Sequence, residues 1–88
     1  MEKRIGTISI LVCDRTQSHQ INDILSEFGD IILCRQGLPF QDKPVAVISL
    51  IVNGSSDRIN ALNGRIGRLH GVECKAMLAK TAFESESF

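Results

Sequence analysis

The feature that most constrains this chain is the run Val45–Val52, in which Ser49 is the one polar residue among eight. A run this apolar and this rich in β-branched side chains is typical of a strand that is covered on both faces. The neighbouring segments of the 88-residue chain supply enough helix to cover one side of a sheet only. The other side of the sheet is therefore predicted to be a contact surface.

Charge and apolar patterning exclude several classes of protein. Ten basic side chains balance ten acidic ones, so no net charge draws the chain onto nucleic acid, and no direct nucleic-acid partner is expected. The N-terminal apolar segment is interrupted by Thr7 and Ser9 and has no small-residue cleavage site, which indicates a strand and not a signal peptide. No apolar stretch approaches the ~18 residues of a membrane helix, so no membrane partner is expected.

Cysteine usage and size predict a cytoplasmic oligomer. Cys13, Cys34 and Cys74 cannot all pair within the chain, and their spacing matches no structural zinc pattern. Unpaired cysteines are typical of a reducing cytoplasm. A domain of this size buries only about 60–65% of its unfolded surface, so self-association as a homodimer or homotetramer is the natural supplement to its core.

Hydrophobic periodicity predicts one domain over residues 1–80, followed by a tail, residues 81–88, to which no role is assigned. Alternating segments predict strands at residues 4–12, 31–38, 45–52 and 72–78. Apolar residues spaced by three and four predict two amphipathic helices. One runs from Asp14 to Phe28, and the other follows the capping segment 53–56 and carries the stripe Ile59, Leu62, Ile66 and Leu69 before Gly71. Asp14 is the predicted cap of the first helix, and Gly29 and Gly71 are predicted to end the two helices.

The order strand, helix, strand, strand, helix, strand is that of an α+β, ferredoxin-like βαββαβ domain. Right-handed crossovers give an antiparallel sheet of strand order 4-1-3-2 with two helices on one face. Side-chain alternation leaves an apolar set on the other face, which is the predicted oligomer interface: Leu11, Val45, Val47, Ile51 and Met77. Two alternatives remain: the tail folds back over this face, or scattered apolar exposure is tolerated.

One edge of the predicted sheet collects the candidates for binding a ligand. The topology brings together the end of the first strand, the start of the first helix, the hairpin turn and the end of the second helix, with Cys13, Asp14, Arg15, Arg35, Gly37, Pro39, His70 and Gly71. The first six of these are the candidate ligand-binding residues. Helix-terminal amides attract anions, and Arg15 or Arg35 can hold a carboxylate in a bidentate pair. The competing structural roles are helix capping for Asp14 and a solvated surface charge for each arginine.

Gly64 and Gly67 lie inside the period of the second predicted helix. Each costs about 1 kcal/mol relative to Ala there, which indicates that they permit helix packing at close range, against the sheet or against a neighbouring subunit. No Lys-Ser or Lys-Thr follows them, so they do not form a phosphate loop.

Metal binding and catalysis are not expected. Side-chain alternation places Cys74 on the helix side of the sheet and Cys13 on the open side, while Cys34 lies on another strand. His19 and His70 sit at helix ends, and neither has a Ser, Cys or carboxylate at a spacing typical of a nucleophile and its base. We therefore expect no metal, no cofactor and no enzyme activity.

The sequence resembles the iron-only hydrogenase system regulators, a small family with the ACT-like fold that also forms the C-terminal, ligand-binding domain of nickel-responsive regulators. The resemblance covers residues 5–80 and rests on Asp14-Arg15 after the first strand, on Ile32–Pro39, and on Ile59–Gly67 leading to Gly71 and Val72. It implies a non-enzymatic regulatory or sensing module that acts as a homo-oligomer and binds a small effector near the loop after the first strand. Hydrogenase maturation or regulatory proteins are the implied protein partners.

The sequence also departs from the nickel-responsive relatives. It has no histidine in the second and third strands and lacks their DNA-binding ribbon, which argues against nickel sensing and direct repression. The alternative to an effector-binding regulator is a protein-interaction adaptor with no small-molecule ligand.

Overall fold

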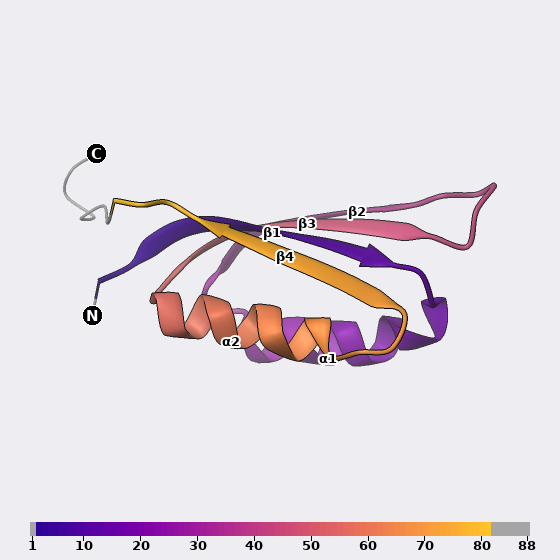
Figure 1. The fold of residues 1–88 in the computed structure, drawn as a ribbon, viewed down its shortest axis with the longest axis horizontal. Helices are drawn as coiled ribbons and strands as arrows, with labels where there is room; N and C mark the ends of the chain where they lie inside the picture. The colour runs from indigo at the N-terminus through magenta and orange to yellow at the C-terminus, as the bar shows by residue number, and fades with distance from the viewer. Residues whose placement is uncertain (1, 82–88) are drawn as a thin grey trace.

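The computed structural model of the protein describes residues 2–81. One layer is a four-stranded sheet and the other is a pair of helices (Figure 1). The elements in chain order are β1 (Arg4–Val12), the 3-10 helix η1 (Arg15–Gln17), α1 (Ser18–Glu27), β2 (Ile32–Pro39), β3 (Ala46–Gly54), α2 (Ser56–Gly67) and β4 (Val72–Leu78). The predicted tail begins at residue 81, and its residues 82–88 lie outside the described range.

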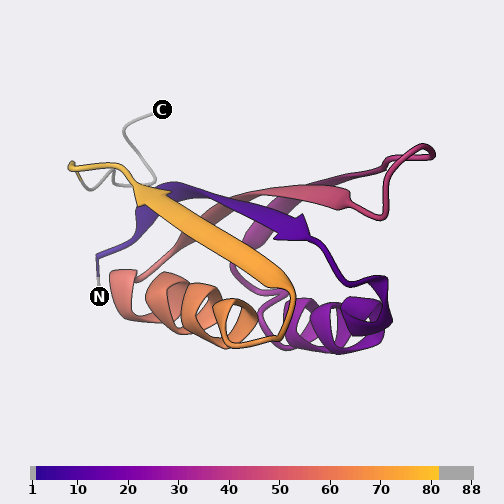
Figure 2. The same cartoon turned by 45° about the vertical axis from the view of Figure 1, so that its right-hand side comes forward.

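The strands follow the order β2-β3-β1-β4, and each neighbouring pair is antiparallel. Both helices cover the same face of the sheet, as Figures 1 and 2 show from two directions. The predicted order, 4-1-3-2, and the predicted single helical layer are confirmed. Register is continuous through β1, β3 and β4, whereas β2 is irregular between Ile32 and Cys34. β2 is an edge strand, and such an irregularity is common there.

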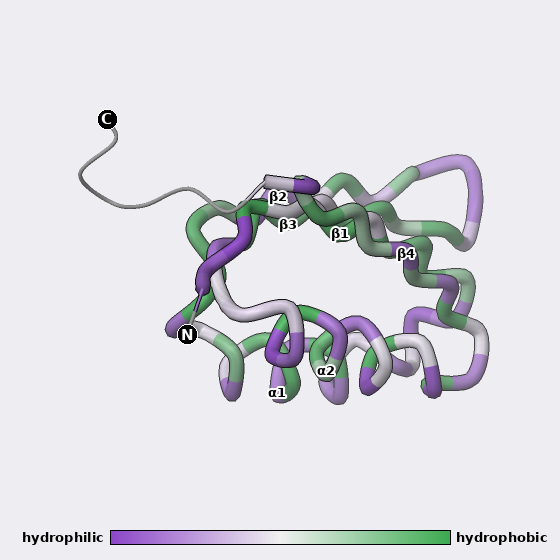
Figure 3. The backbone as a smooth tube through the Cα atoms, turned by 60° about the vertical axis from the view of Figure 1, so that its left-hand side comes forward, coloured by the Kyte–Doolittle hydropathy of each residue, from purple (hydrophilic) through white to green (hydrophobic). Residues whose placement is uncertain are grey.

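The core lies between the two layers and is built from alternating strand positions and one side of each helix. Ile8 and Ile10 of β1 and Leu50 and Val52 of β3 are at most 1% exposed. The helices, with the residue that follows α1, supply Ile21, Ile24, Leu25, Phe28, Ile59, Leu62 and Ile66. Figure 3 shows hydrophobic and hydrophilic segments alternating along both helices, as expected for helices that bury one side. Each fully buried side chain of this size stabilises the fold by about 1.5–3 kcal/mol.

The first helix begins differently from the prediction. Asp14 caps the short helix η1, and α1 starts only at Ser18, so the single helix expected from Asp14 to Phe28 is divided in two. Ser55 caps α2, because its hydroxyl accepts a hydrogen bond from the Arg58 amide at 3.2 Å. Among the described residues, Gly71 is the one residue with a left-handed backbone, at φ 73°. Gly29, by contrast, follows α1 without that conformation.

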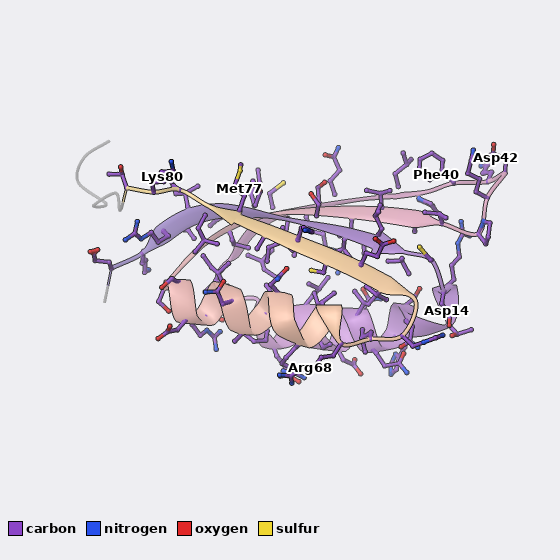
Figure 4. All side chains as sticks on the ribbon, in the orientation of Figure 1. Asp14, Phe40, Asp42, Arg68, Met77 and Lys80 are labelled. Carbon is purple, nitrogen blue, oxygen red and sulfur yellow. The ribbon has the colours of Figure 1, made fainter. Side chains whose placement is uncertain are left out.

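The side of the sheet away from the helices, here called the open face, carries three rows of cross-strand neighbours. Two rows are largely apolar: one holds Leu38, Val47, Leu11 and Glu73, and the other holds Cys34, Ile51, Thr7 and Met77. The central row between them is polar and holds Gln36, Ser49, Ser9 and Lys75. Met77, labelled in Figure 4, projects away from the helices and is 70% exposed. The open face is therefore apolar in two bands and polar between them.

Four of the five predicted interface residues lie in the apolar rows: Leu11, Val47, Ile51 and Met77. Val45 lies just before β3 and is half-buried. Leu38 is 59% exposed in one of the apolar rows and was not among the predicted interface residues. That these residues form an oligomer interface remains a prediction.

Candidate functional site

Two turns meet at the end of the sheet where β1 finishes and β4 begins. The Cys13 amide donates to the carbonyl oxygen of Gly71 at 2.8 Å. A Cβ added to Gly71 would lie 2.6 Å from the Cβ of Asp14, a separation that real Cβ atoms do not adopt. The turn after β1 and the turn before β4 are thus packed together, and the glycine permits it both by its backbone angle and by its lack of a side chain.

Asp14, labelled in Figure 4, acts as a helix cap at this edge of the sheet. Its Oδ1 accepts hydrogen bonds from the Thr16 hydroxyl at 2.6 Å and from the Thr16 amide at 3.0 Å. These bonds, the hydroxyl first, hold the pKa of the Asp14 carboxyl below its ordinary value. The carboxylate is therefore engaged and negatively charged, which suits a structural cap better than contact with an anionic ligand.

Arg15 joins η1 to the connection between β2 and β3. Its Nη2 donates to three backbone carbonyl oxygens, those of Phe40 at 2.6 Å, Val45 at 3.2 Å and Lys43 at 3.3 Å. Phe40 and Asp42, labelled in Figure 4, mark the position of this connection beyond the end of the sheet. Arg15 thus fastens the hairpin connection to the start of the first helix.

Arg35 lies on the helix side of β2, because it pairs with the buried Leu50 of β3. Its Nη2 donates to Oδ1 of Asn22 on α1 at 2.6 Å. This contact borders a hollow of about 100 Å³ between α1 and the β2–β3 hairpin. The hollow is lined by Val12, Ser18, Ile21, Asn22, Arg35, Ala46 and Ile48. It combines an aliphatic floor with a rim of one hydroxyl, one amide and one guanidinium.

The predicted ligand-binding residues divide between the hollow and its surroundings. Arg35 lines the hollow, and Gly37 and Pro39 lie on the same strand opposite Ile48 and Ala46, which also line it. Cys13, Asp14 and Arg15 occupy the adjoining turns and do not line the hollow. Their role in binding remains a prediction.

Sequence reasoning missed the contribution of α1 to the hollow. Ser18 and Asn22 are separated by four residues, so both face the same side of the helix. The available signal was a pair of polar residues at this spacing beside the apolar stripe that contains Ile21. Such a pair indicates a polar border to the buried side of the helix.

The cysteines occupy different environments. Cys74 is half-buried on the helix side, as predicted, with its Sγ 2.9 Å from Oδ1 of Asn63. Burial raises the pKa of the Cys74 thiol to about 11. Cys13 and Cys34 are exposed. Within residues 2–81, no three His, Cys, Asp or Glu side chains are grouped so that they could hold a metal ion.

Gly64 and Gly67 were both predicted to permit close packing of the second helix, and their surroundings differ. A Cβ at Gly67 would make ordinary contact with the Cβ of Cys74 at 3.9 Å, whereas a Cβ at Gly64 would meet nothing within 4 Å. Packing of Gly64 against its own sheet is therefore wrong, because this residue lies on the exposed side of α2. Close approach by a neighbouring subunit remains the other half of that prediction.

The strand order and the single helical layer define the chain as a ferredoxin-like α+β domain. A family model described as "Iron-only hydrogenase system regulator, putative" matches residues 4–76, and the chain belongs to this TM1266-like family. In the described residues, no helix is long and apolar enough to cross a membrane.

Solved structures agree with this assignment. The chain is similar to the uncharacterized protein TM1266 from Thermotoga maritima, with a TM-score of 0.84 and 35% identity over 90% of this chain and 100% of that one. An unknown protein from Galdieria sulphuraria matches with a TM-score of 0.62 and 14% identity over 93% of this chain and 48% of that one. CutA1 from Oryza sativa matches with a TM-score of 0.52 and 16% identity, covering 93% and 85% of the two chains. The last two show the fold alone. No curated protein matches the chain by sequence.

Proposed function

We propose that the protein is a non-enzymatic regulatory module of an iron-only hydrogenase system, acting in the cytoplasm as a homo-oligomer that binds a small effector beside the turn after β1. Family membership supports the regulatory role. The hollow bordered by Arg35 is the observation that carries effector binding, because it joins an apolar floor to a guanidinium.

The chemistry of the hollow indicates a small aliphatic carboxylate. An arginine guanidinium pairs with a carboxylate through two parallel charge-assisted bonds, whereas it now makes one such bond to the neutral amide of Asn22. Val12, Ile21 and Ile48 offer aliphatic contact for the rest of the ligand. Cavities of about 150 Å³ hold a benzene-sized molecule, so the part of the ligand inside this smaller hollow is compact.

Thermal unfolding tests this proposal with isobutyrate and valine as probes and isobutanol as the probe without a carboxylate. We expect the carboxylates to raise the melting temperature in a saturable way, since a ligand at 100 times its Kd stabilises the native state by about 2.7 kcal/mol. Arg35→Gln should remove the effect. Arg68→Gln makes the same chemical change at an exposed arginine that does not line the hollow and should preserve it. Equal responses of the two variants would refute the site.

Self-association is proposed to use the open face. Its two apolar rows expose Met77 and Leu38 at 70% and 59%, and burying several such side chains favours association by about 1.5–3 kcal/mol each. Val47→Lys combined with Ile51→Lys places two charges in these rows. Native mass spectrometry of protein purified without oxygen should show an oligomer for the wild type and a smaller species for this double variant. Gln20→Lys combined with Ser26→Lys, on the exposed side of α1, is the matched control.

The alternative function is a protein-interaction adaptor with no small-molecule ligand. The open face favours it, because its exposed apolar side chains would serve a protein partner equally well. Oligomers that bind purified hydrogenase maturation proteins, and that respond to none of the carboxylate probes, would support the adaptor over the sensor.

A further inference from the structure

The outer side of α2 carries four exposed residues in one line, here called the α2 ridge: Asp57, Ala61, Gly64 and Arg68. Their spacings of four, three and four keep them on one side of a helix. The buried residues Ile59, Leu62 and Ile66 occupy the opposite side. Arg68, labelled in Figure 4, projects from the helical layer away from the sheet. The ridge is therefore the outermost line of the helical layer.

The two charges of the ridge have no partner within the described residues. No ion pair or side-chain hydrogen bond there involves Asp57 or Arg68, whereas the neighbouring Arg58 and Arg65 are paired with Asp30 and Glu27. Asp57 and Arg68 lie eleven residues apart, which is about 16 Å along a helix. Between them, Gly64 costs about 1 kcal/mol relative to Ala without any close contact inside the chain.

We propose that the α2 ridge binds the α2 ridge of a second copy, with the two helices antiparallel. The four positions are symmetric about the point midway between residues 62 and 63. A two-fold axis at this point sets Asp57 against Arg68 of the second copy, and Ala61 against Gly64 of the second copy, each twice. The small residues allow the helices to approach closely, and the charges form two intermolecular ion pairs. A parallel arrangement would set like charges against each other.

This interface is independent of the proposed sheet-face association, because the ridge and the open face lie on opposite sides of the molecule. Copies that used both interfaces would form an assembly larger than a dimer, closed if the two two-fold axes intersect and open-ended if they do not. A single helix pair buries less than the ~1,000 Å² of a typical stable interface, so the ridge association should be weak and should require high protein concentration.

The test uses the Val47→Lys and Ile51→Lys background, which removes the open face from consideration. Sedimentation velocity from about 10 µM to about 1 mM should show a monomer–dimer equilibrium. Asp57→Lys alone and Arg68→Glu alone should each weaken the dimer at least about tenfold, since attraction becomes repulsion at both ends. An equimolar mixture of the two single variants should dimerise again, because every facing pair is then of opposite sign.

The mixture of Asp57→Lys and Arg68→Glu distinguishes a contact between copies from an effect of the two charges on the stability of α2. Asp57 and Arg68 also suit the dipole of α2, so each reversal lowers the stability of the monomer, but mixing cannot restore that. Asp42→Lys, in the β2–β3 connection, is the control and should leave association unchanged. A mixture that stays monomeric, or single variants that dimerise like their parent, would overturn the proposal. If the Val47→Lys and Ile51→Lys background does not fold, Asp57→Lys, Arg68→Glu and their mixture are made with the native Val47 and Ile51. Light scattering then compares the assembly sizes of these samples.

Discussion

Gly71 and Asp14 lie so close together that a Cβ on the glycine would be 2.6 Å from the Cβ of the aspartate. This contact joins the two turns at the edge of the sheet that also holds the start of the first helix. The same position has a φ of 73°, so backbone and packing both require glycine there.

Gly71→Ala should therefore lower the free energy of unfolding by more than about 2 kcal/mol, which combines a strained left-handed backbone with a steric clash. Urea unfolding followed by circular dichroism measures the change. Asp14→Gly combined with Gly71→Ala should recover part of the loss, because it removes the Cβ that is struck. An unchanged free energy of unfolding in Gly71→Ala would show that the two turns can separate at little cost.

Gly64→Ala should have the opposite effect. A Cβ there meets no atom within 4 Å, so the substitution removes only the helix penalty of glycine and should raise stability by about 1 kcal/mol. Urea unfolding at low protein concentration, where copies are apart, isolates this term. A loss of stability in dilute solution would contradict the open surroundings of Gly64.

Arg15→Gln should loosen the connection between β2 and β3. Three carbonyl oxygens lose their donor, and since the site is exposed the cost should be about 1 kcal/mol. Hydrogen–deuterium exchange of the Phe40 amide, which donates to Val45 at 3.0 Å, should become faster. Arg35→Gln serves as the control, because Arg35 bonds to α1 and not to this connection. Unchanged exchange in Arg15→Gln would remove Arg15 from this role.

The ion pair between Glu27 and Arg65 should contribute to acid sensitivity. The Arg65 guanidinium lowers the pKa of Glu27 from its ordinary 4.5, so the folded carboxyl stays charged at a pH where the unfolded one has gained its proton. The contribution is complete above the ordinary value and is lost as the pH falls through the folded value. In melting curves recorded from neutral pH downward, Glu27→Gln should show a shallower acid loss of stability than wild type. Arg65→Gln should reproduce this shallower profile. A steeper acid loss of stability in either variant would contradict a stabilising contribution from this ion pair.

Thiol labelling should separate the three cysteines. Burial raises the pKa of Cys74 to about 11, so little thiolate is present at pH 8, whereas Cys13 and Cys34 are exposed. Iodoacetamide followed by peptide mapping should modify Cys74 last. Because Cys34 belongs to the open face, its labelling should also slow at protein concentrations at which the copies associate. Equal rates for all three thiols would contradict the described burial of Cys74.

Much of the fold could be predicted because its signals are local. The alternation of Ile8, Ile10 and Val12 and the helical stripe of Ile59, Leu62 and Ile66 each record which side of an element is buried. Handedness then left one arrangement of the strands. The start of the first helix was harder, since Asp14 caps a short 3-10 turn as readily as it caps an α-helix, and both begin with the same hydrogen bond.

The candidate site was predictable only in outline. Arg35 could be assigned to the right strand, but its position beside Asn22 depends on how far α1 lies from the edge strand, which no local pattern records. Arg15 could not be assigned to the hairpin connection for a similar reason: its three acceptors are backbone carbonyls, and these have no sequence signature.

The central row of the open face limits how anything can lie upon it. Ser9, Ser49, Gln36 and Lys75 cross the whole sheet between two apolar rows. A partner displaced along the strands by two residues would place its own aliphatic groups over these hydroxyl, amide and ammonium groups. The polar groups would lose their hydrogen bonds to water and gain none in return, which costs about 1–3 kcal/mol for each group. The open face therefore selects a partner by the position of its apolar and polar rows, and not by hydrophobicity alone.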